Sequence, residues 1–225
     1  MVKLVIPGSP AALAGIRSGD VILSVDGQTV LSPDALIGWV RGHAPGTRGG
    51  FGILRNKHTR VLAVELAGCP SDDDLWRMLY VDLPAPTLEG LEAVRGQIPR
   101  GSTALRGHVT VIEFWAAWCP ACRFLVPFLN KWHRRFSRDG LNVLAVTTDP
   151  PETAALAATQ LEMEYNIASD GSTRTTRAYR GQALPTLFVV DRQGVVRDVV
   201  VGYSAKRLLD IESLLERLMT AAAQK

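Results

Sequence analysis

The sequence is poor in cysteine, in net charge and in long apolar runs. Its 225 residues include three cysteines, too few for a small scaffold held together by disulfides, so their chemistry matters more than their number. The 25 Lys and Arg residues nearly balance the 22 Asp and Glu residues, which gives a formal net charge of +3. A dedicated nucleic-acid binder is usually more basic, with its charge clustered on one face. We therefore expect no nucleic-acid partner.

No window contains the roughly 18 uninterrupted apolar residues that a membrane-spanning helix needs. The most apolar stretch, residues 109–122, is interrupted by Glu113, so we expect no membrane span in this chain. The first ten residues also lack the apolar region of a signal peptide. Two interpretations follow: the protein is cytosolic, or the sequence is a fragment whose leader lies upstream of Met1.

Residues 1–68 predict a small domain that is mainly β. Two helices, at residues 9–16 and 32–41, each begin with Ser followed by Pro, which suit the N-cap and the first helical position. Short runs rich in Val, Ile and Leu lie between turns and predict strands at residues 2–6, 21–25, 50–55 and 60–66.

One series of residues in this segment carries a family resemblance. It runs Pro7-Gly8-Ser9-Pro10-Ala11-Ala12, Ala14-Gly15-Ile16, Gly19-Asp20-Val21-Ile22 and Val25-Asp26-Gly27, with Val30 after it. With this series residues 1–68 resemble the bacterial PDZ domains of the HtrA kind. Such domains bind the C-terminus of a partner by adding it as a strand to a sheet edge. The resemblance implies a C-terminal peptide ligand and a groove lined by Val2, Leu4, Ala35, Leu36, Trp39 and Val40.

The beginning of the chain bears on that groove. In such domains the carboxylate-binding loop precedes the strand that matches residues 2–6, so we expect it to be missing or to lie upstream of Met1. The alternative is an incomplete PDZ-like fold that packs on its neighbour and binds no peptide.

Residues 69–86 predict a linker. Cys69-Pro70 and Leu83-Pro84-Ala85-Pro86 mark its two ends, and a short helical pattern lies between them. Cys69 is interpreted as a structural or exposed free thiol. The alternative, a third redox partner for the other two cysteines, requires the linker to fold back.

From residue 87 to residue 225 strands and helices alternate, which predicts a layered α/β domain. The strands are expected at residues 109–115, 141–147, 165–168, 186–191 and 195–202. The helices are expected at residues 119–137, 151–163, 172–179 and 204–223.

The chemistry is concentrated at Cys119-Pro-Ala-Cys122, where a buried strand leads into a helix. Cys119 then lies at the helix N-terminus, where backbone N–H groups favour the thiolate, and we expect it to be the nucleophile. Cys122 follows one turn later on the same face, close enough to attack a mixed disulfide. Zinc would require a second pair of ligands, and His133 stands alone. We expect no metal and no cofactor.

These residues carry a second resemblance. Glu113-Phe-Trp-Ala-Ala-Trp-Cys-Pro-Ala-Cys122, Pro127 within the helix and Leu184-Pro185-Thr186 before a strand resemble a thioredoxin-fold protein. The lead-in at residues 84–88, the strand end at residues 147–149 and the turn at residues 191–194 are most similar to TlpA-like thiol-disulfide oxidoreductases.

The resemblance implies a thioredoxin fold, a central mixed sheet flanked by helices, after the PDZ-like domain. It implies protein thiol or disulfide substrates and a redox partner that supplies or accepts electrons. Pro185 would be a cis-proline facing the two cysteines, with Trp118, Pro120 and Leu184 contacting substrate, and Pro127 would kink the helix. We expect a disulfide reductase in preference to an oxidase, although Pro120 and Ala121 do not fix the redox potential.

Glu113 stands out because it interrupts a buried strand six residues before Cys119. A carboxylate buried without a partner is costly, and desolvation raises its pKa. In thioredoxins an acid at the matching position helps to move the proton of the second cysteine, and we carry that role to Glu113. The alternative is a Glu paired with a buried basic group or a water.

Two classes of function follow from these motifs. The first is a thiol-disulfide oxidoreductase whose PDZ-like module selects a substrate or partner; the second is a non-catalytic peptide-binding module with a redox switch. Many TlpA-like reductases have Glu three residues after the second cysteine, where this chain has Leu125, so acid assistance falls to Glu113 alone. By resemblance we expect a periplasmic or cell-envelope location.

Overall fold

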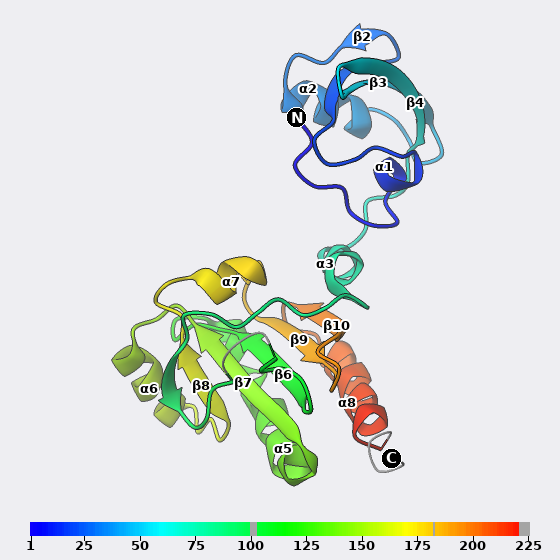
Figure 1. Ribbon diagram of the computed structural model, residues 1–225. Helices are drawn as coiled ribbons and strands as arrows, with labels where there is room; N and C mark the ends of the chain where they lie inside the picture. The colour runs from blue at the N-terminus through cyan, green and yellow to red at the C-terminus, as the bar shows by residue number, and fades with distance from the viewer. Residues whose placement is uncertain (100–102, 182, 221–225) are drawn as a thin grey trace. The chain divides into compact units, whose positions relative to one another are not determined.

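The computed structural model describes residues 1–99, 103–181 and 183–220 (Figure 1). Its contacts divide the chain into two compact units, Met1–Leu79 and Tyr80–Lys225. Each unit has its own sheet and its own apolar core. Among the described residues no helix combines the length and the apolar character that crossing a bilayer requires.

The first unit is a four-stranded antiparallel sheet in the order β2-β1-β3-β4. Its elements are α1 (Pro10–Leu13), β1 (Val21–Val25), β2 (Gln28–Thr29), α2 (Pro33–Arg41), β3 (Arg48–Arg55) and β4 (His58–Glu65), followed by α3 (Asp72–Tyr80). The predicted caps are confirmed, since the Ser9 and Ser32 hydroxyls accept hydrogen bonds from the N–H groups three residues on.

The strand predicted at residues 2–6 is wrong. Val2 makes the backbone contacts with the turn before β1: its N–H donates to the Asp20 carbonyl and its own carbonyl accepts from the Gly19 N–H. The Ser18 hydroxyl of that turn also donates to the Lys3 carbonyl at 2.8 Å. No strand is assigned to residues 2–6, because that turn offers backbone partners to one residue and Pro7 then lacks an N–H.

A partly buried ion pair joins the turn before β1 to the sheet of the first unit. The Asp20 carboxylate accepts hydrogen bonds from the Arg17 N–H at 2.8 Å and from the Arg55 guanidinium at 2.7 Å. Arg55 also donates to the Gly15 carbonyl at 2.7 Å. The hydrogen bond from Arg55 lowers the pKa of Asp20 to about 2. Arg55 of β3 thus fixes two parts of the motif that carries the PDZ resemblance, Gly15 and Asp20.

The second unit is a six-stranded mixed sheet in the order β10-β9-β6-β7-β8-β5. The central strands β6, β7 and β8 are parallel, and β9, β10 and β5 run antiparallel to their neighbours. The strands are β5 (Glu92–Arg95), β6 (Val109–Phe114), β7 (Leu141–Thr147), β8 (Asn166–Ser169), β9 (Thr186–Val190) and β10 (Val196–Val201). The helices are α4 (Pro120–Arg123), α5 (Val126–Phe136), η1 (Ser137–Asp139), α6 (Pro151–Gln160), α7 (Arg174–Ala178) and α8 (Ala205–Thr220). This is the predicted thioredoxin-type arrangement, with β5 in addition to the predicted strands.

The two faces of this sheet are covered differently. The face that carries Val109, Val111 and Trp115 packs against α5 and α8 in one apolar cluster. The opposite face carries an aromatic cluster in which the rings of Tyr80, Phe114, Tyr179 and Phe188 meet at centroid distances of 5.0 to 6.0 Å. Thus β6 is buried on both faces, as its continuous apolar run predicts.

Residues 80–86, predicted as part of the linker, pair with the second unit. Backbone hydrogen bonds join Asp82 and Leu83 to Val196, and the Ala85 N–H donates to the Gly194 carbonyl. The lead-in to the sheet is thus fixed along the β9–β10 hairpin.

The helix predicted at residues 119–137 is interrupted at Phe124 and Leu125, immediately before the turn that contains Pro127, the residue predicted to kink it. The first helix, α4, ends at Arg123 and α5 begins at Val126, with Pro127 in its first turn. Pro127 has no N–H to donate to the Arg123 carbonyl, so a continuous helix would lose that bond and meet a clash. The last helix ends at Thr220 within the described residues, and predicted residues 221–223 lie outside them.

Candidate redox site

Cys119 and Cys122 form a disulfide at the point where the loop after β6 enters α4. Cys119 is the N-cap of α4, and its Sγ accepts a hydrogen bond from the Cys122 N–H at 3.2 Å. Pro120, at the first helical position, has no N–H to satisfy there. When the disulfide is reduced, the same N–H is placed to stabilise a thiolate on Cys119.

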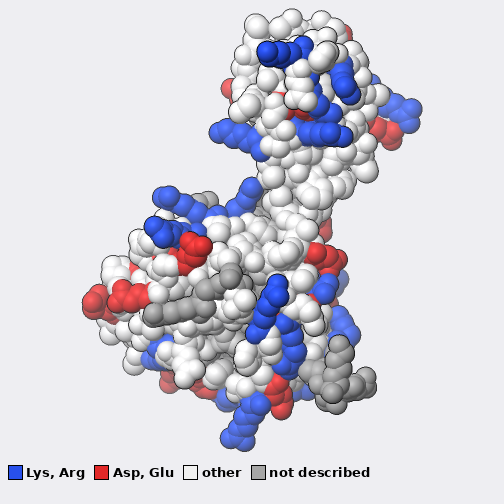
Figure 2. Space-filling model, in the orientation of Figure 1, with Lys and Arg blue, Asp and Glu red and all other residues white. Residues whose placement is uncertain are grey.

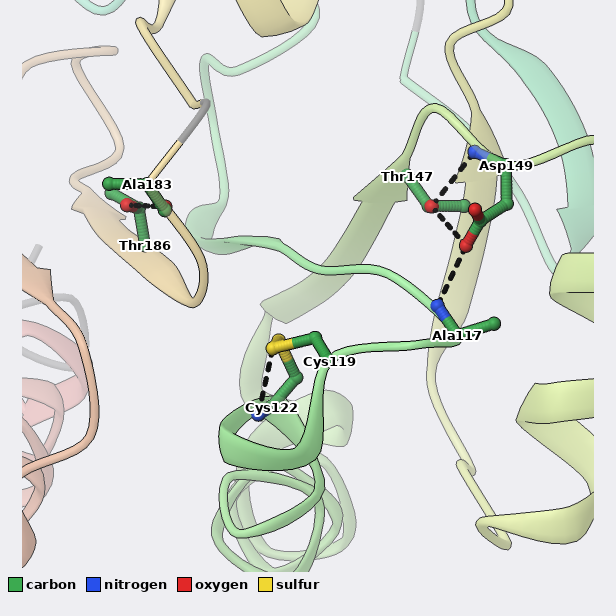
Figure 3. The surroundings of a disulfide bond; sticks show 7 residues. All are labelled: Ala117, Cys119, Cys122, Thr147, Asp149, Ala183 and Thr186. Atoms are coloured by element: carbon green, nitrogen blue, oxygen red, sulfur yellow. Dashed lines mark hydrogen bonds between the residues drawn. A yellow bond between two sulfur atoms is a disulfide. The ribbon is translucent and has the colours of Figure 1, made fainter.

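A carboxylate from the neighbouring strand holds the loop that precedes the disulfide (Figure 3). Asp149, just beyond β7, accepts hydrogen bonds from the Ala117 N–H at 2.7 Å and from the Thr147 hydroxyl at 3.0 Å. The Asp149 N–H in turn donates to that hydroxyl at 3.0 Å. Sequence reasoning included Asp149 only in a strand end of the family resemblance and missed this contact.

The Leu184–Pro185 peptide bond is cis, as predicted. The Pro185 carbonyl accepts from the Gly202 N–H at 2.7 Å, and the Thr186 hydroxyl donates to the Ala183 carbonyl. Figure 3 shows this turn in the surroundings of the disulfide. Leu184 is half-buried and packs against the same apolar cluster as the two cysteines.

The disulfide is buried, while several apolar side chains around it are exposed. Cys119 and Cys122 are 3% and 2% exposed, whereas Trp118 is 72% exposed. Phe124 and Tyr203, 59% and 44% exposed, pack their rings together at a centroid distance of 5.3 Å. Sequence reasoning missed this pair, since the only signal was the position of Phe124 two residues after Cys122. Exposed aromatic side chains therefore occur directly before Cys119, at Trp118, and two residues after Cys122, at Phe124.

Two of the predicted substrate contacts line a common cavity. Trp118 and Leu184 bound a space of about 350 Å³, together with Phe114, Trp115, Val146, Thr148, Thr173, Thr176, Arg177 and Gly181. Pro120 is exposed and is not among the lining residues.

Glu113 is buried, as its place in the strand predicts. It is 1% exposed, and among the described residues neither of its carboxylate oxygens has a hydrogen-bond partner. Desolvation raises the pKa of Glu113 to about 8. The carboxyl group thus holds a proton near neutral pH and can release it slightly above, which suits a general acid and base.

The predicted peptide groove is only partly assembled in the first unit. Val2 and Leu36 line a cavity of about 350 Å³ with Met1, Val21, Ile22, Val30, Leu31, Ser32 and Pro33. Leu4, Ala35 and Val40 are exposed and do not line it. Trp39 stacks on His43 and meets the Phe51 ring edge-on, so it is a packing residue of the unit.

The remaining cysteine, Cys69, is exposed and unbonded, in agreement with its interpretation as a free thiol.

Lys and Arg side chains are spread over the visible face of the second unit among acidic ones (Figure 2). Within the described ranges no group of three or more His, Cys, Asp or Glu side chains is arranged to hold a metal ion.

Two family models match the chain. One, described as a PDZ domain, matches residues 1–48. The other, described as the AhpC/TSA family, matches residues 81–199, which is more than half of the 225 residues. The chain belongs to the AhpC/TSA family. Its fold is the thioredoxin fold, preceded by a small β unit of PDZ type.

Two curated proteins illustrate the similarity of the chain to known relatives. The thiol-disulfide oxidoreductase ResA of Bacillus cereus is 27% identical over 107 residues, which is 47% of this AhpC/TSA-family chain and 62% of the relative. Protein DipZ of Mycobacterium tuberculosis is 30% identical over 147 residues, 61% of this chain and 21% of the relative. The chain therefore spans less than two thirds of the length of these relatives.

A solved structure is similar to the chain at comparable identity. It belongs to a protein of Chlorobium tepidum provisionally assigned as the thiol:disulfide interchange protein DsbE. The match has a TM-score of 0.53 and 26% identity, and covers 62% of this chain and 99% of that one.

Proposed function

We propose that the chain is a TlpA-like thiol-disulfide oxidoreductase that cycles Cys119 and Cys122 between dithiol and disulfide. The observation that carries the proposal is the arrangement at the disulfide. A helix N-cap cysteine, a cis-proline turn and a buried acid on the adjoining strand occur in one unit. The names of the ResA and DsbE relatives support it.

In the reducing direction the Cys119 thiolate attacks one sulfur of a substrate disulfide. A mixed disulfide forms and the first substrate thiolate leaves. The Cys122 thiol gives its proton to the Glu113 carboxylate in the molecules in which that group is ionised, a minor fraction near neutral pH that grows towards pH 8. The resulting thiolate attacks the Cys119 sulfur. The enzyme disulfide forms, the second substrate thiolate leaves, and Glu113 returns its proton to that thiolate or to solvent. Two electrons pass from the enzyme dithiol to the substrate disulfide.

We propose this direction in preference to oxidation, with a second redox protein that returns electrons to the disulfide. The first experiment is the reduction potential of the pair in glutathione and dithiothreitol buffers. A reduction potential of about −250 mV or lower supports a reductase, and one of about −120 mV indicates an oxidant. Cys119→Ser should abolish the couple and Cys69→Ser should leave it unchanged. If the parent shows no reversible couple, the enzyme proposal fails and the redox-switch alternative fails with it.

We further propose that the PDZ-like unit, of the HtrA kind, holds the C-terminal segment of a substrate or partner in the cavity that Val2 and Leu36 line. The apolar lining of that cavity supports the proposal. Fluorescence polarisation of the full chain with labelled C-terminal peptides tests it. Leu36→Asp should weaken binding while Leu13→Asp, on an exposed side chain of α1, should not. Binding that is equal in both variants would exclude this cavity.

We propose a location outside the cytoplasm, in the periplasm or cell envelope, which rests on the TlpA-like resemblance. Fractionation of cells that express the native gene tests it, and recovery of the protein with the cytosolic fraction would overturn it.

A further inference from the structure

Glu113 shares its sheet face with a second buried polar side chain, Tyr165. Across the sheet Glu113 lies beside Leu187 of β9 and Ala145 of β7, and Ala145 lies beside Ile167 of β8. Side chains two apart on a strand point to the same face, so Tyr165, two residues before Ile167, faces the same side as Glu113. The Ala145 side chain ends at Cβ, which leaves room above β7 for the phenol ring to extend towards β6.

Both groups are buried without a hydrogen-bond partner. Glu113 and Tyr165 are each 1% exposed, and within the described part of the chain neither the two carboxylate oxygens nor the phenol oxygen has a bonded partner. Each of the two groups nevertheless shifts the pKa of the other. Tyr165 opposes the desolvation that raises the pKa of Glu113, and the Glu113 charge adds to the burial that raises the pKa of Tyr165. Tyr165 therefore keeps its proton and faces the carboxyl group as a donor.

The other charged groups around this face are occupied elsewhere. Asp149, beyond the end of β7, accepts from Ala117 and Thr147. On α5 and α8, Lys131 and Arg135 pair with Glu212. On β10, Asp198 lies beside Val189 and pairs with Arg207 of α8 at 2.9 Å. The apolar cluster itself includes Tyr165, Cys119 and Cys122.

We propose that Tyr165 is a positioning residue of the redox site, whose hydroxyl donates a hydrogen bond to Glu113 whenever that carboxyl group is ionised. The bond fixes the orientation of the carboxylate and makes Glu113 a stronger acid than burial alone would allow. The proton from Cys122 resides on Glu113, and Tyr165 sets how tightly it is held. This inference rests on the proposed thiol-disulfide exchange and adds the partner that adjusts its working pH.

The test is the pH dependence of disulfide exchange in full-length Tyr165→Phe, which keeps the ring and removes the donor. The limb of the pH–rate profile that reports ionisation of Glu113 should move to higher pH by about one unit. This is the size expected of a hydrogen bond to a charged group. Incorporation of 3-fluorotyrosine at position 165, a stronger donor of nearly the same size, should move the limb down. Opposite shifts from two nearly isosteric changes would not arise from a merely structural role.

Tyr179→Phe is the matched control. Tyr179 is also buried in the second unit, but on the aromatic face, and its hydroxyl donates to the Pro86 carbonyl. Its variant should lose stability without moving the pH limb. In Glu113→Gln the limb should be absent, and adding Tyr165→Phe should change the profile no further.

Direct titration of the Glu113 carboxyl by carbon-13 NMR separates this proposal from the proposed function. If the parent lacks exchange activity but Tyr165→Phe raises the pKa of Glu113, the pairing stands and the enzyme proposal fails. If exchange is active and the pKa of Glu113 is the same in the parent and Tyr165→Phe, the pairing is overturned.

Discussion

The Asp149 carboxylate accepts a hydrogen bond from the Ala117 N–H at 2.7 Å and so joins the end of β7 to the loop that carries Cys119. The two residues are 32 positions apart in the chain, and the contact stands beside the disulfide (Figure 3). The same carboxylate oxygen also accepts a hydrogen bond from the hydroxyl of Thr147, the last residue of β7, so the strand fixes the position of that oxygen.

Asp149→Ala should destabilise the second unit by about 1.5–3 kcal/mol, the value of a hydrogen bond to a charged group, and slow disulfide exchange. Urea unfolding and an exchange assay measure the two effects. Asp149→Asn is the control, because its amide oxygen can accept both hydrogen bonds and should retain most of the rate. An Ala variant as active as the parent would show that the loop keeps its geometry without this bond.

Glu113→Gln should change how the stability of the second unit depends on pH. The folded-state pKa, about 8, lies above the ordinary value of 4.5, so the folded protein binds more protons than the unfolded chain between these values. The stability contributed by protonated Glu113 is complete below about 4.5 and is lost as pH rises through 8. The parent should lose up to about 1.4 kcal/mol per pH unit in this window, and the Gln variant should lack this contribution. Thermal unfolding at pH 5 and pH 8 compares them, and parallel curves would contradict the assignment.

Arg55→Met should weaken the first unit in an acid-dependent manner. Asp20 has a folded pKa lowered to about 2, so its stabilising effect is present above the ordinary value of 3.8 and is lost as pH falls through 2. Without Arg55 this contribution is absent, so the variant should be less stable than the parent above about pH 3.8, and the difference should shrink as pH falls through 2. Amide hydrogen exchange of β3 across pH 2 to 5 measures it, with Arg60→Met, on the exposed side of β4, as the control. Equal protection in the two variants would mean that the ion pair adds nothing.

Phe124→Ser should slow disulfide exchange with a protein substrate about tenfold, which corresponds to a loss of about 1.4 kcal/mol of contact free energy. The rate of exchange with a small aromatic disulfide should be unchanged. The reason is that the Phe124 and Tyr203 rings are exposed beside the buried disulfide, where only a large partner contacts both. Steady-state rates with the two substrates give the comparison. Leu156→Ser alters an equally exposed apolar side chain on α6 and should have no effect; a loss equal to that of Phe124→Ser would assign the change to the surface in general.

Features that depend on a few adjacent residues could be predicted from the sequence. Ser9 and Ser32 cap their helices, Cys119 begins one, and Pro185 follows a cis bond, because each depends on a short local motif. The burial of Glu113 followed from the apolar run around it.

Features that join distant residues could not be predicted. The contacts of Asp149 with Ala117 and of Asp20 with Arg55 span 32 and 35 positions, and only the folded sheet brings the partners together. The edge strand β5 was missed because Glu92-Ala-Val-Arg95 has too few apolar residues for a strand pattern. The strand expected at residues 2–6 had the right composition but lacked a neighbour, and composition does not supply one.

The family match begins at residue 81, one position after a side chain that the second unit needs. The Tyr80 ring meets Phe188 edge-on at 5.1 Å between centroids, and its hydroxyl donates to the Ala178 carbonyl. A protein cut at the family boundary would leave an empty space against Phe188 and an uncapped carbonyl at the end of α7. An excised oxidoreductase domain that is meant to behave like the parent should therefore start upstream of Tyr80.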